Sequence, residues 1–497
     1  MKKIKLILCA GMLFSIAQSC SDDFLEVEPK GQQVSSNYYK DEAEAYAGLV
    51  ATYSSLRKNS GGFENMITMM NAASDDNYPG GGGPTDGLGI HSFGNFTIDA
   101  NTIPGSFWSV HYQGIFRANI LLLNLPKTVM DEAKKEKFAA EAKMLRALYY
   151  FNLVRMFKNV PLILEPLSPT TMYEVTQAAP EAVYAQIETD LTEAISKLPV
   201  VADEPGRMTQ GAAKALLGKV YLYEGKNSQA AQILAEVNGT PGGTSQYGYK
   251  LLSNFADLWL TDNKFNTESI LEVRHYDLGG SGWGNWGMDS DQGNSVNVMV
   301  GPRGYVKKSA DAPDLPSGWS FNVFTQDFYD FIKNDPRFPA TVLDLKTMQE
   351  QGKVEYIGGD QDTGYFLNKF TPRTSDISTG PGDAVLNYRQ DTYVIRLADT
   401  YLMEAEALGA TGSRAQALLD AVRARVGLAS VPVSMQAIKD ERRRELAGEG
   451  HRFFDLVRWG DAPSKLGSRG FVAGKNEILP IPYNELQNTK LVQNPGY

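Results

Sequence analysis

Four stretches of the chain carry apolar residues at the three- and four-residue spacing of an amphipathic helix. They span residues 37–58, 112–157, 180–237 and 393–426. In the second stretch, Phe138, Ala142, Leu145 and Tyr149 follow one another at steps of four, three and four, so they share one helix face. The last three stretches each divide into two helices. The pattern therefore predicts a mainly α-helical body built from helix pairs.

The third and fourth stretches resemble each other in composition. Residues 212–234 contain small residues, a Leu-Gly step and tyrosines, followed by a glycine turn. Leu397, Ala398, Tyr401 and Leu402 repeat this scheme. Close helix packing of this kind is typical of tetratricopeptide-type units, which stack because none can bury its apolar face alone. The units here are scattered between long insertions, and for any one of them a plain helical hairpin is an equal alternative.

Three intervening regions are predicted to be irregular. Residues 75–102, 239–318 and 352–390 are rich in glycine together with aspartate, asparagine, proline or aromatic residues. Long loops in a compact protein are usually functional or disordered. The aromatic residues argue against disorder, so we expect these regions to form the ligand-binding face.

The first 20 residues have the pattern of a lipoprotein signal peptide. Lys2, Lys3 and Lys5 precede an apolar run that is too short to span a membrane, and small residues then lead to Cys20. This predicts removal of residues 1–19 and lipid attachment to Cys20. The alternative is an ordinary secreted protein with an acidic tail. Cys9 would be removed with the signal, so the mature chain would have no internal disulfide and would depend on a large core.

Composition and motifs narrow the possible functions. The chain has 48 basic and 58 acidic residues and a net charge of −10, which does not favour nucleic-acid binding. None of the four histidines is paired at a metal-ligand spacing. No Gly-x-Ser-x-Gly motif is present, and no cysteine of the mature chain is placed as a nucleophile. We therefore expect neither an enzyme nor a metal or other cofactor.

Two loops carry candidate ligand-binding residues. Asp75 and Asp76 precede the glycine run 80–83, and Asp86 follows it. Their carboxylates could orient sugar hydroxyls, and the spacing does not fit a loop-type calcium site. The alternative for this segment is a helix-ending turn with acidic caps.

The second loop contains Trp283 and Trp286, which lie between glycines, and Trp319 is similarly placed farther on. Exposed indoles bind the apolar face of sugar rings. The alternative is a loop pinned to the helices by its tryptophans. Arg373 and Arg389 could bind hydroxyls or carboxylates, although a solvated loop charge is the better interpretation of each.

The segments 440–446 and 450–460 alternate arginines with acids around an apolar stripe. Arg442 lies three residues from Glu445, and Arg452 lies three residues from Asp455, so the pattern predicts ion pairs within each helix. This run and the endings 479–482 and 493–497 resemble the C-terminal signature of the SusD/RagB family of outer-membrane lipoproteins. Gly448 departs from that pattern, in which we expect a bulky apolar residue.

The resemblance implies a fold and a function. It implies one domain over residues 20–497, with a tetratricopeptide-like body and a loop-rich face. It also implies a lipoprotein held at the outer membrane by Cys20 and exposed at the cell surface, where Ser21-Asp22-Asp23 resembles an export tag. Such a protein captures a glycan and delivers it to a SusC-like TonB-dependent transporter. Several family members bind ligand from the loop that holds Asp75 and Asp76.

Two alternatives to glycan capture stay open. The same fold could capture peptides for uptake, in a groove with fewer exposed tryptophans. A surface glycoside hydrolase is less favoured, since the sequence singles out no pair of acids for it. Trp283 and Trp286 favour a glycan.

Overall fold

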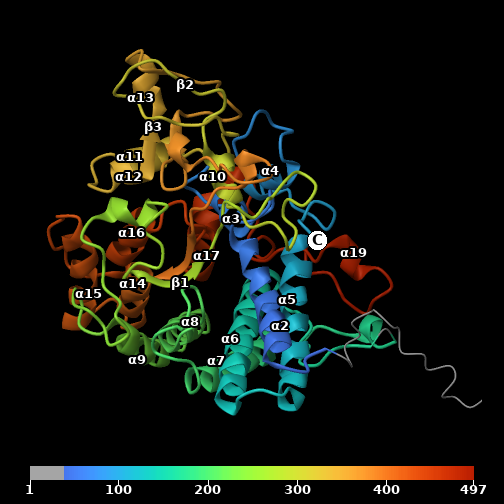
Figure 1. Ribbon diagram of the computed structural model, residues 1–497. Coiled ribbons are helices and arrows are strands. Elements are labelled where there is room, and N and C mark those ends of the chain that lie inside the picture. Colours follow the sequence, from blue (N-terminus) through green and yellow to red (C-terminus); the bar gives the residue numbers. More distant parts are fainter. Residues whose placement is uncertain (1–37, 169) are drawn as a thin grey trace, which may run out of the picture.

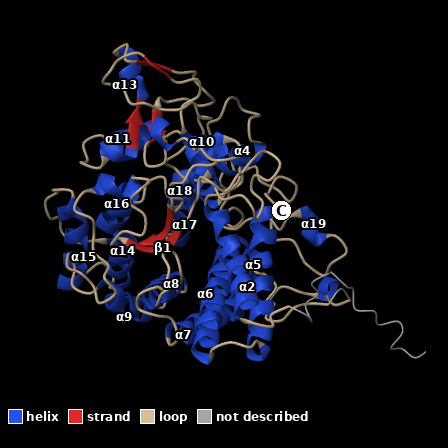
Figure 2. Cartoon of the chain, in the orientation of Figure 1, coloured by secondary structure: helices blue, strands red, loops and turns tan. Residues whose placement is uncertain are grey.

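The computed structural model describes residues 38–168 and 170–497, and helices dominate it (Figures 1 and 2). A bundle of long helices fills the lower part of Figure 1, and a loop-rich region lies above it. The predicted signal peptide and Cys20 lie outside the described residues. None of the described helices is both long enough and apolar enough to cross a membrane.

The helical body is a series of helices that each pack on the next. It contains α5 (Ser106–Asn124), α6 (Glu132–Phe157), α7 (Pro180–Ile195), α8 (Gln210–Tyr223) and α9 (Asn227–Asn238). The series continues from α9 to α14 (Leu397–Ala407) and then to α15 (Gly412–Arg425). Helix α2 (Glu42–Ser54) packs against α5 and α6. The predicted mainly α-helical fold is confirmed.

Three predicted helix boundaries are wrong. Helix α5 begins at Ser106, six residues before the predicted start at residue 112. Helix α2 begins at Glu42, later than the start of the predicted stretch, and is capped by Asp41, whose side chain accepts a hydrogen bond from the Glu44 amide at 3.0 Å. Residues 393–396 are extended: they belong to β6 (Thr392–Arg396), which pairs antiparallel with β1 (Ser269–Val273). The run Thr-Tyr-Val-Ile is β-branched and aromatic, so it favours a strand.

The loop-rich region contains only short elements. Its helices are α3 (Met66–Ala72), α4 (Leu88–Gly94), α10 (Ser295–Val300), α11 (Gln326–Ile332), α12 (Phe338–Thr341) and α13 (Leu345–Glu350). Strand β2 (Val306–Lys307) pairs with β4 (Val354–Glu355), and β3 (Val342–Asp344) pairs with β5 (Tyr365–Leu367). Helices α4 and α10 lie in ranges predicted to be irregular. They have seven and six residues, too few for a helical period to show in the sequence.

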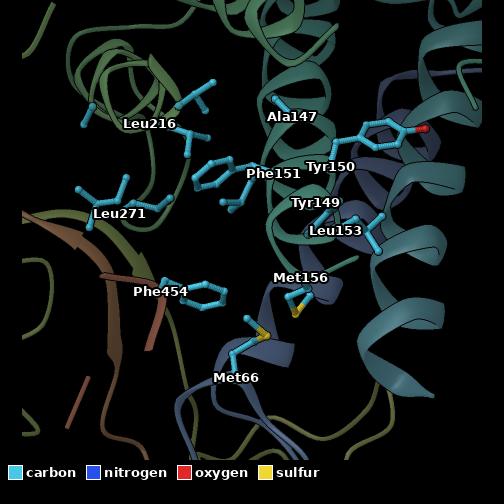
Figure 3. Packing of buried hydrophobic residues seen from close by; sticks show 14 of the residues in the cluster. Met66, Ala147, Tyr149, Tyr150, Phe151, Leu153, Met156, Leu216, Leu271 and Phe454 are labelled. Carbon is cyan, nitrogen blue, oxygen red and sulfur yellow. The ribbon is translucent and has the colours of Figure 1, made fainter. Parts of the chain in front are cut away.

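One hydrophobic core joins distant parts of the chain around α6 (Figure 3). Tyr149 and Phe151 of α6 are at most 1% exposed. Figure 3 shows Leu216 of α8, Leu271 of β1 and Phe454 of α17 (Arg452–Arg458) around this helix. The C-terminal segment is therefore part of the same core as the helical body.

The C-terminal arginines make ion pairs mainly across elements. The segment continues through α16 (Met435–Glu445), α17, α18 (Ala462–Leu466) and α19 (Tyr483–Leu486). Arg442 binds Asp399 at 2.7 Å and Asp455 at 2.9 Å, and it does not pair with Glu445. Glu445 instead binds Arg396 at 2.6 Å. The prediction of pairs within each helix is thus wrong for Arg442, and also for Arg452, which binds Asp75 at 2.7 Å and not Asp455. Packing places carboxylates of other elements beside both guanidiniums.

Gly448 is required by the backbone at its position. Its φ is +76°, and a Cβ atom there would lie 2.3 Å from Cδ1 of Leu367. Its carbonyl accepts a hydrogen bond of 2.8 Å from Nδ2 of Asn71. The expectation of a bulky residue here is therefore wrong, since any side chain would be strained and would collide with its neighbour.

Candidate functional site

Trp283, Trp286 and Trp319 form one cluster, called here the tryptophan cluster. The rings of Trp283 and Trp319 are nearly parallel, with centroids 6.0 Å apart and an interplanar angle of 25°. Trp286 meets each of them edge to face, with centroids 5.7 and 5.5 Å away. Trp283 is 59% exposed, whereas the other two are partly buried. The structure thus brings together all three tryptophans that the sequence suggested, and it leaves one indole open to solvent.

Phenylalanines support the tryptophan cluster from the side of the protein. Phe63 contacts Trp286 and Trp319 with centroid distances of 5.9 and 6.4 Å, and it packs edge to face on the buried Phe321. Nε1 of Trp286 donates a hydrogen bond of 2.8 Å to Oγ of Ser295, at the start of α10. Trp286 is therefore fixed in orientation, and it fits the alternative of a pinned loop better than Trp283 does.

Arginines of the helical body anchor the loop that carries Trp283 and Trp286. Arg57 donates to the backbone carbonyls of Asp289 and Asp291, and Arg117 of α5 pairs with the carboxylate of Asp289. At the other end of the loop, the Trp283 amide donates to Oδ2 of Asp383 at 3.2 Å. The exposed indole therefore stands on a loop that is tied at both ends.

Asp86 lies at the edge of the tryptophan cluster. Its Oδ2 accepts hydrogen bonds from the Gly82 amide at 2.7 Å and from Nη2 of Arg303 at 2.9 Å. The same Nη2 lies 3.3 Å from the carbonyl oxygen of Trp319. Both members of this ion pair are about one-third exposed, so they offer polar groups beside the aromatic surface.

Asp75 and Asp76 lie elsewhere, in a buried ion-pair network. Asp75 accepts two hydrogen bonds from Arg452, at 2.7 and 2.8 Å, and Asp76 accepts one from Nε of Arg443 at 2.7 Å. Burial alone would raise the pKa of Asp75, but the hydrogen bonds and charge of Arg452 lower it below its ordinary value. Burial raises the pKa of Asp76. Neither carboxylate is free to meet a ligand, so both are left out of the site proposed below.

Arg373 is also separate from the tryptophan cluster. It lines a different cavity, together with Trp259, Asn368 and Arg389. Its guanidinium donates to the Thr371 carbonyl at 2.6 Å and to Oδ1 of Asn368 at 2.8 Å. The structure therefore does not combine Arg373 with the aromatic residues in one site.

One histidine, His275, lies in the interior near the anchored loop and contacts the backbone of Gln292. The buried His275 contacts Oγ of Ser60 through Nε2 at 2.7 Å, and burial lowers its pKa to about 3. It therefore stays neutral at physiological pH. Within residues 38–168 and 170–497, no three His, Cys, Asp or Glu side chains are grouped as a metal site. The arrangement suits non-covalent binding of a ligand with an apolar face.

The site includes residues that the sequence did not reveal. They are Phe63, Arg303, Asp383 and the anchoring pair Arg57 and Arg117, and they come from four separate segments of the chain. Phe63 follows two glycines, which was the one local signal of a special loop. The roles of the other four depend on contacts between distant segments, for which the sequence has no spacing rule.

Comparison with known proteins shows which family the chain matches. Residues 267–470 match the model described as the SusD family, and residues 23–222 match the model described as "Starch-binding associating with outer membrane". The SusD-like protein P25 of Formosa agariphila is 28% identical over 550 residues, which cover all of both chains.

Solved structures agree with this assignment. A structure named as a laminarin binding SusD-like protein is 65% identical to this chain, with a TM-score of 0.92, and the match covers 92% of this chain and 100% of that one. Surface glycan-binding protein A from Bacteroides thetaiotaomicron, in complex with laminarihexaose, is 25% identical with a TM-score of 0.81. That match covers 91% of this chain and 99% of the other. The chain belongs to the SusD/RagB family.

Proposed function

We propose that this protein binds a glycan of the laminarin type at the tryptophan cluster. The observation that carries the proposal is the set of three indoles in contact, with 59% of Trp283 exposed. A large aromatic side chain that stays exposed on a well-anchored loop is typical of a ligand-binding surface. The similarity to a laminarin binding protein and to a protein solved with laminarihexaose supports this choice of glycan.

Each part of the site has a distinct role in the proposed binding. The exposed face of Trp283 stacks on the apolar face of a sugar ring. Trp319, whose ring is nearly parallel to that of Trp283, extends the aromatic surface, and Trp286 supports both rings edge to face. Asp86 and Arg303 orient hydroxyl groups at the edge, because each keeps hydrogen-bonding capacity toward solvent. No covalent step is needed, and we propose no catalytic residue.

The proposed cellular role is capture at the outer membrane. Lipid on Cys20 would hold the protein at the cell surface, and the glycan would pass to a SusC-like TonB-dependent transporter. The signal-like pattern of residues 1–20 and the outer-membrane description of the model over residues 23–222 support this role. Several acyl chains on one cysteine would anchor stably, whereas a single chain would not.

Calorimetry on the chain from Ser21 onward tests the proposal. Laminarihexaose and laminarin should give saturable heat, with affinities on the order of micromolar to millimolar for an exposed aromatic surface. An unrelated polysaccharide and a peptide mixture are the comparison ligands. Heat from peptides alone would support peptide capture instead. Shortened laminarihexaose after prolonged incubation, detected by chromatography, would indicate a hydrolase and refute binding without turnover.

A further inference from the structure

A second cavity, of about 560 Å³, lies in the loop-rich region, and none of the three clustered tryptophans lines it. It is called here the arginine cavity and is defined by Trp259, Asn368, Lys369, Arg373, Asp376 and Arg389. Its volume falls in the range of small-molecule binding sites. It is therefore large enough for a ligand of its own.

The charges that line the arginine cavity are mostly positive. Lys369, Arg373 and Arg389 lie on its wall together with two acids, Asp262 and Asp376. The whole chain has a net charge of −10, whereas three of the five charged residues on this wall are cations. The cavity thus offers an anion a favourable position on an otherwise acidic molecule.

Two of the three cations already have acidic partners. The Nζ atom of Lys369 binds Oε1 of Glu449 at 2.8 Å. Arg389 binds Oδ1 of Asp262 at 3.0 Å. Their charges are therefore balanced in large part by the protein itself.

Arg373 is different because both acceptors of its guanidinium are neutral: the Thr371 carbonyl and the amide oxygen of Asn368. The carboxylate of Asp376 accepts the backbone amide of Arg373 at 2.7 Å and attracts its charge, but among the described residues no carboxylate forms an ion pair with the guanidinium. The side chain is partly buried, and this burial lowers the pKa of the guanidinium. A cation in that position gains most from a ligand that brings a negative charge.

The two acids on the wall restrict which anions fit. Asp376 accepts a hydrogen bond of 3.1 Å from Thr261, and Ser375 also lines the cavity. A polyanion would be repelled by Asp262 and Asp376, whereas a ligand with one carboxylate and several hydroxyls would find donors and acceptors for both kinds of group.

We propose that the arginine cavity is a second binding site, which takes the carboxylate of an acidic sugar such as a uronic acid, with Arg373 as the main contact. The guanidinium would bind the carboxylate, and Arg389, Ser375 and Asp376 would meet the hydroxyls. This site is independent of the tryptophan cluster and does not rest on the proposed binding of laminarin.

Titration with free glucuronate, followed by NMR or calorimetry on the chain from Ser21 onward, tests the proposal. Glucuronate should bind, whereas glucose and the methyl ester of glucuronate should bind at least tenfold more weakly, the loss expected for one charge-assisted hydrogen bond. Arg373→Gln should weaken glucuronate binding by the same factor. The matched control Arg274→Gln changes an exposed arginine outside the cavity and should leave binding unchanged.

Further variants separate this site from the tryptophan cluster and from loss of folding. Trp283→Ala should leave glucuronate binding unchanged, whatever it does to laminarin binding. If Arg373→Gln lowers the melting temperature, Arg389→Gln serves as the second variant and should weaken glucuronate binding about fivefold or less, since Arg389 is already paired. Equal binding of glucose and glucuronate, or unchanged binding in a folded Arg373→Gln variant, would overturn the proposal.

Discussion

Removing the indole of Trp283 tests how the proposed glycan site works. The residue is 59% exposed, which for a tryptophan of about 250 Å² leaves about 150 Å² in contact with solvent. One face of the ring accounts for about half of this area. Covering about 75 Å² at about 25 cal/mol per Å² contributes about 2 kcal/mol. Trp283→Ala should therefore weaken laminarihexaose binding by about 25-fold.

The same substitution should leave folding nearly unchanged, because most of this side chain is outside the core. Calorimetry gives the affinity, and chemical denaturation gives the free energy of unfolding. Phe116→Ala is a matched control: Phe116 is an aromatic residue that is 51% exposed, and it lines a different groove, beside Tyr112. A Trp283→Ala variant that binds within twofold of the wild-type protein would refute the stacking argument.

Three further predictions concern the buried charges and the anchored loop. Asp75→Asn leaves Arg452 without its carboxylate partner, so chemical denaturation should show a free energy of unfolding lower by about 3 kcal/mol. Glycan affinity should not change. A stable variant with lost affinity would show that Asp75 contacts the glycan. Burial raises the pKa of Glu272 from 4.5 to about 8, so its contribution to stability is complete below pH 4.5 and is lost as the pH rises through 8. In Glu272→Gln the free energy of unfolding should no longer fall through this pH range. If the variant and the wild-type protein differ in free energy of unfolding by the same amount at pH 5 and at pH 9, the prediction is wrong. Arg117→Ala removes the ion pair that holds Asp289 and the tryptophan loop, so it should weaken glycan binding up to about fivefold with little change in melting temperature. A large drop in melting temperature would show that the contact mainly stabilises the fold.

The long helices were the part of the fold most open to prediction. In α6 and α8 the apolar residues continue for several turns, so the pattern shows the type of element, although both helices are buried on more than the one face that it indicates. Short elements such as α10 lack that repetition. The sequence pattern did not separate strand β6 from helix α14, because the two elements follow each other without a break. The pairing of β6 with β1 shows where the strand ends and the helix begins.

The candidate site was predictable in its aromatic part and not in its charged part. Trp283 and Trp286 lie between glycines, and this local pattern predicted an aromatic cluster, although it did not show that Trp286 packs on Phe63 while Trp283 stays exposed. Asp75 and Asp76 looked equally available, but their partners Arg452 and Arg443 lie more than 360 residues farther along the chain. Local sequence cannot reveal such a partner, so it cannot tell a free carboxylate from a neutralised one.

The packing of α9 on α14 has a consequence for how the chain is made. Helix α9 ends at Asn238, and α14 begins at Leu397, so about 160 residues must emerge before the partner exists. At 5–20 residues per second this takes roughly 8–30 s. During that interval Leu234 of α9 and its apolar neighbours on α8 lack the cover that α14 later provides, which is the kind of surface that chaperones bind and that otherwise aggregates. The insertion that carries the tryptophan loop therefore also delays the pairing of α9 with α14 during synthesis. Variants with a longer insertion should give less folded protein, while the protein that does fold should bind the same ligand.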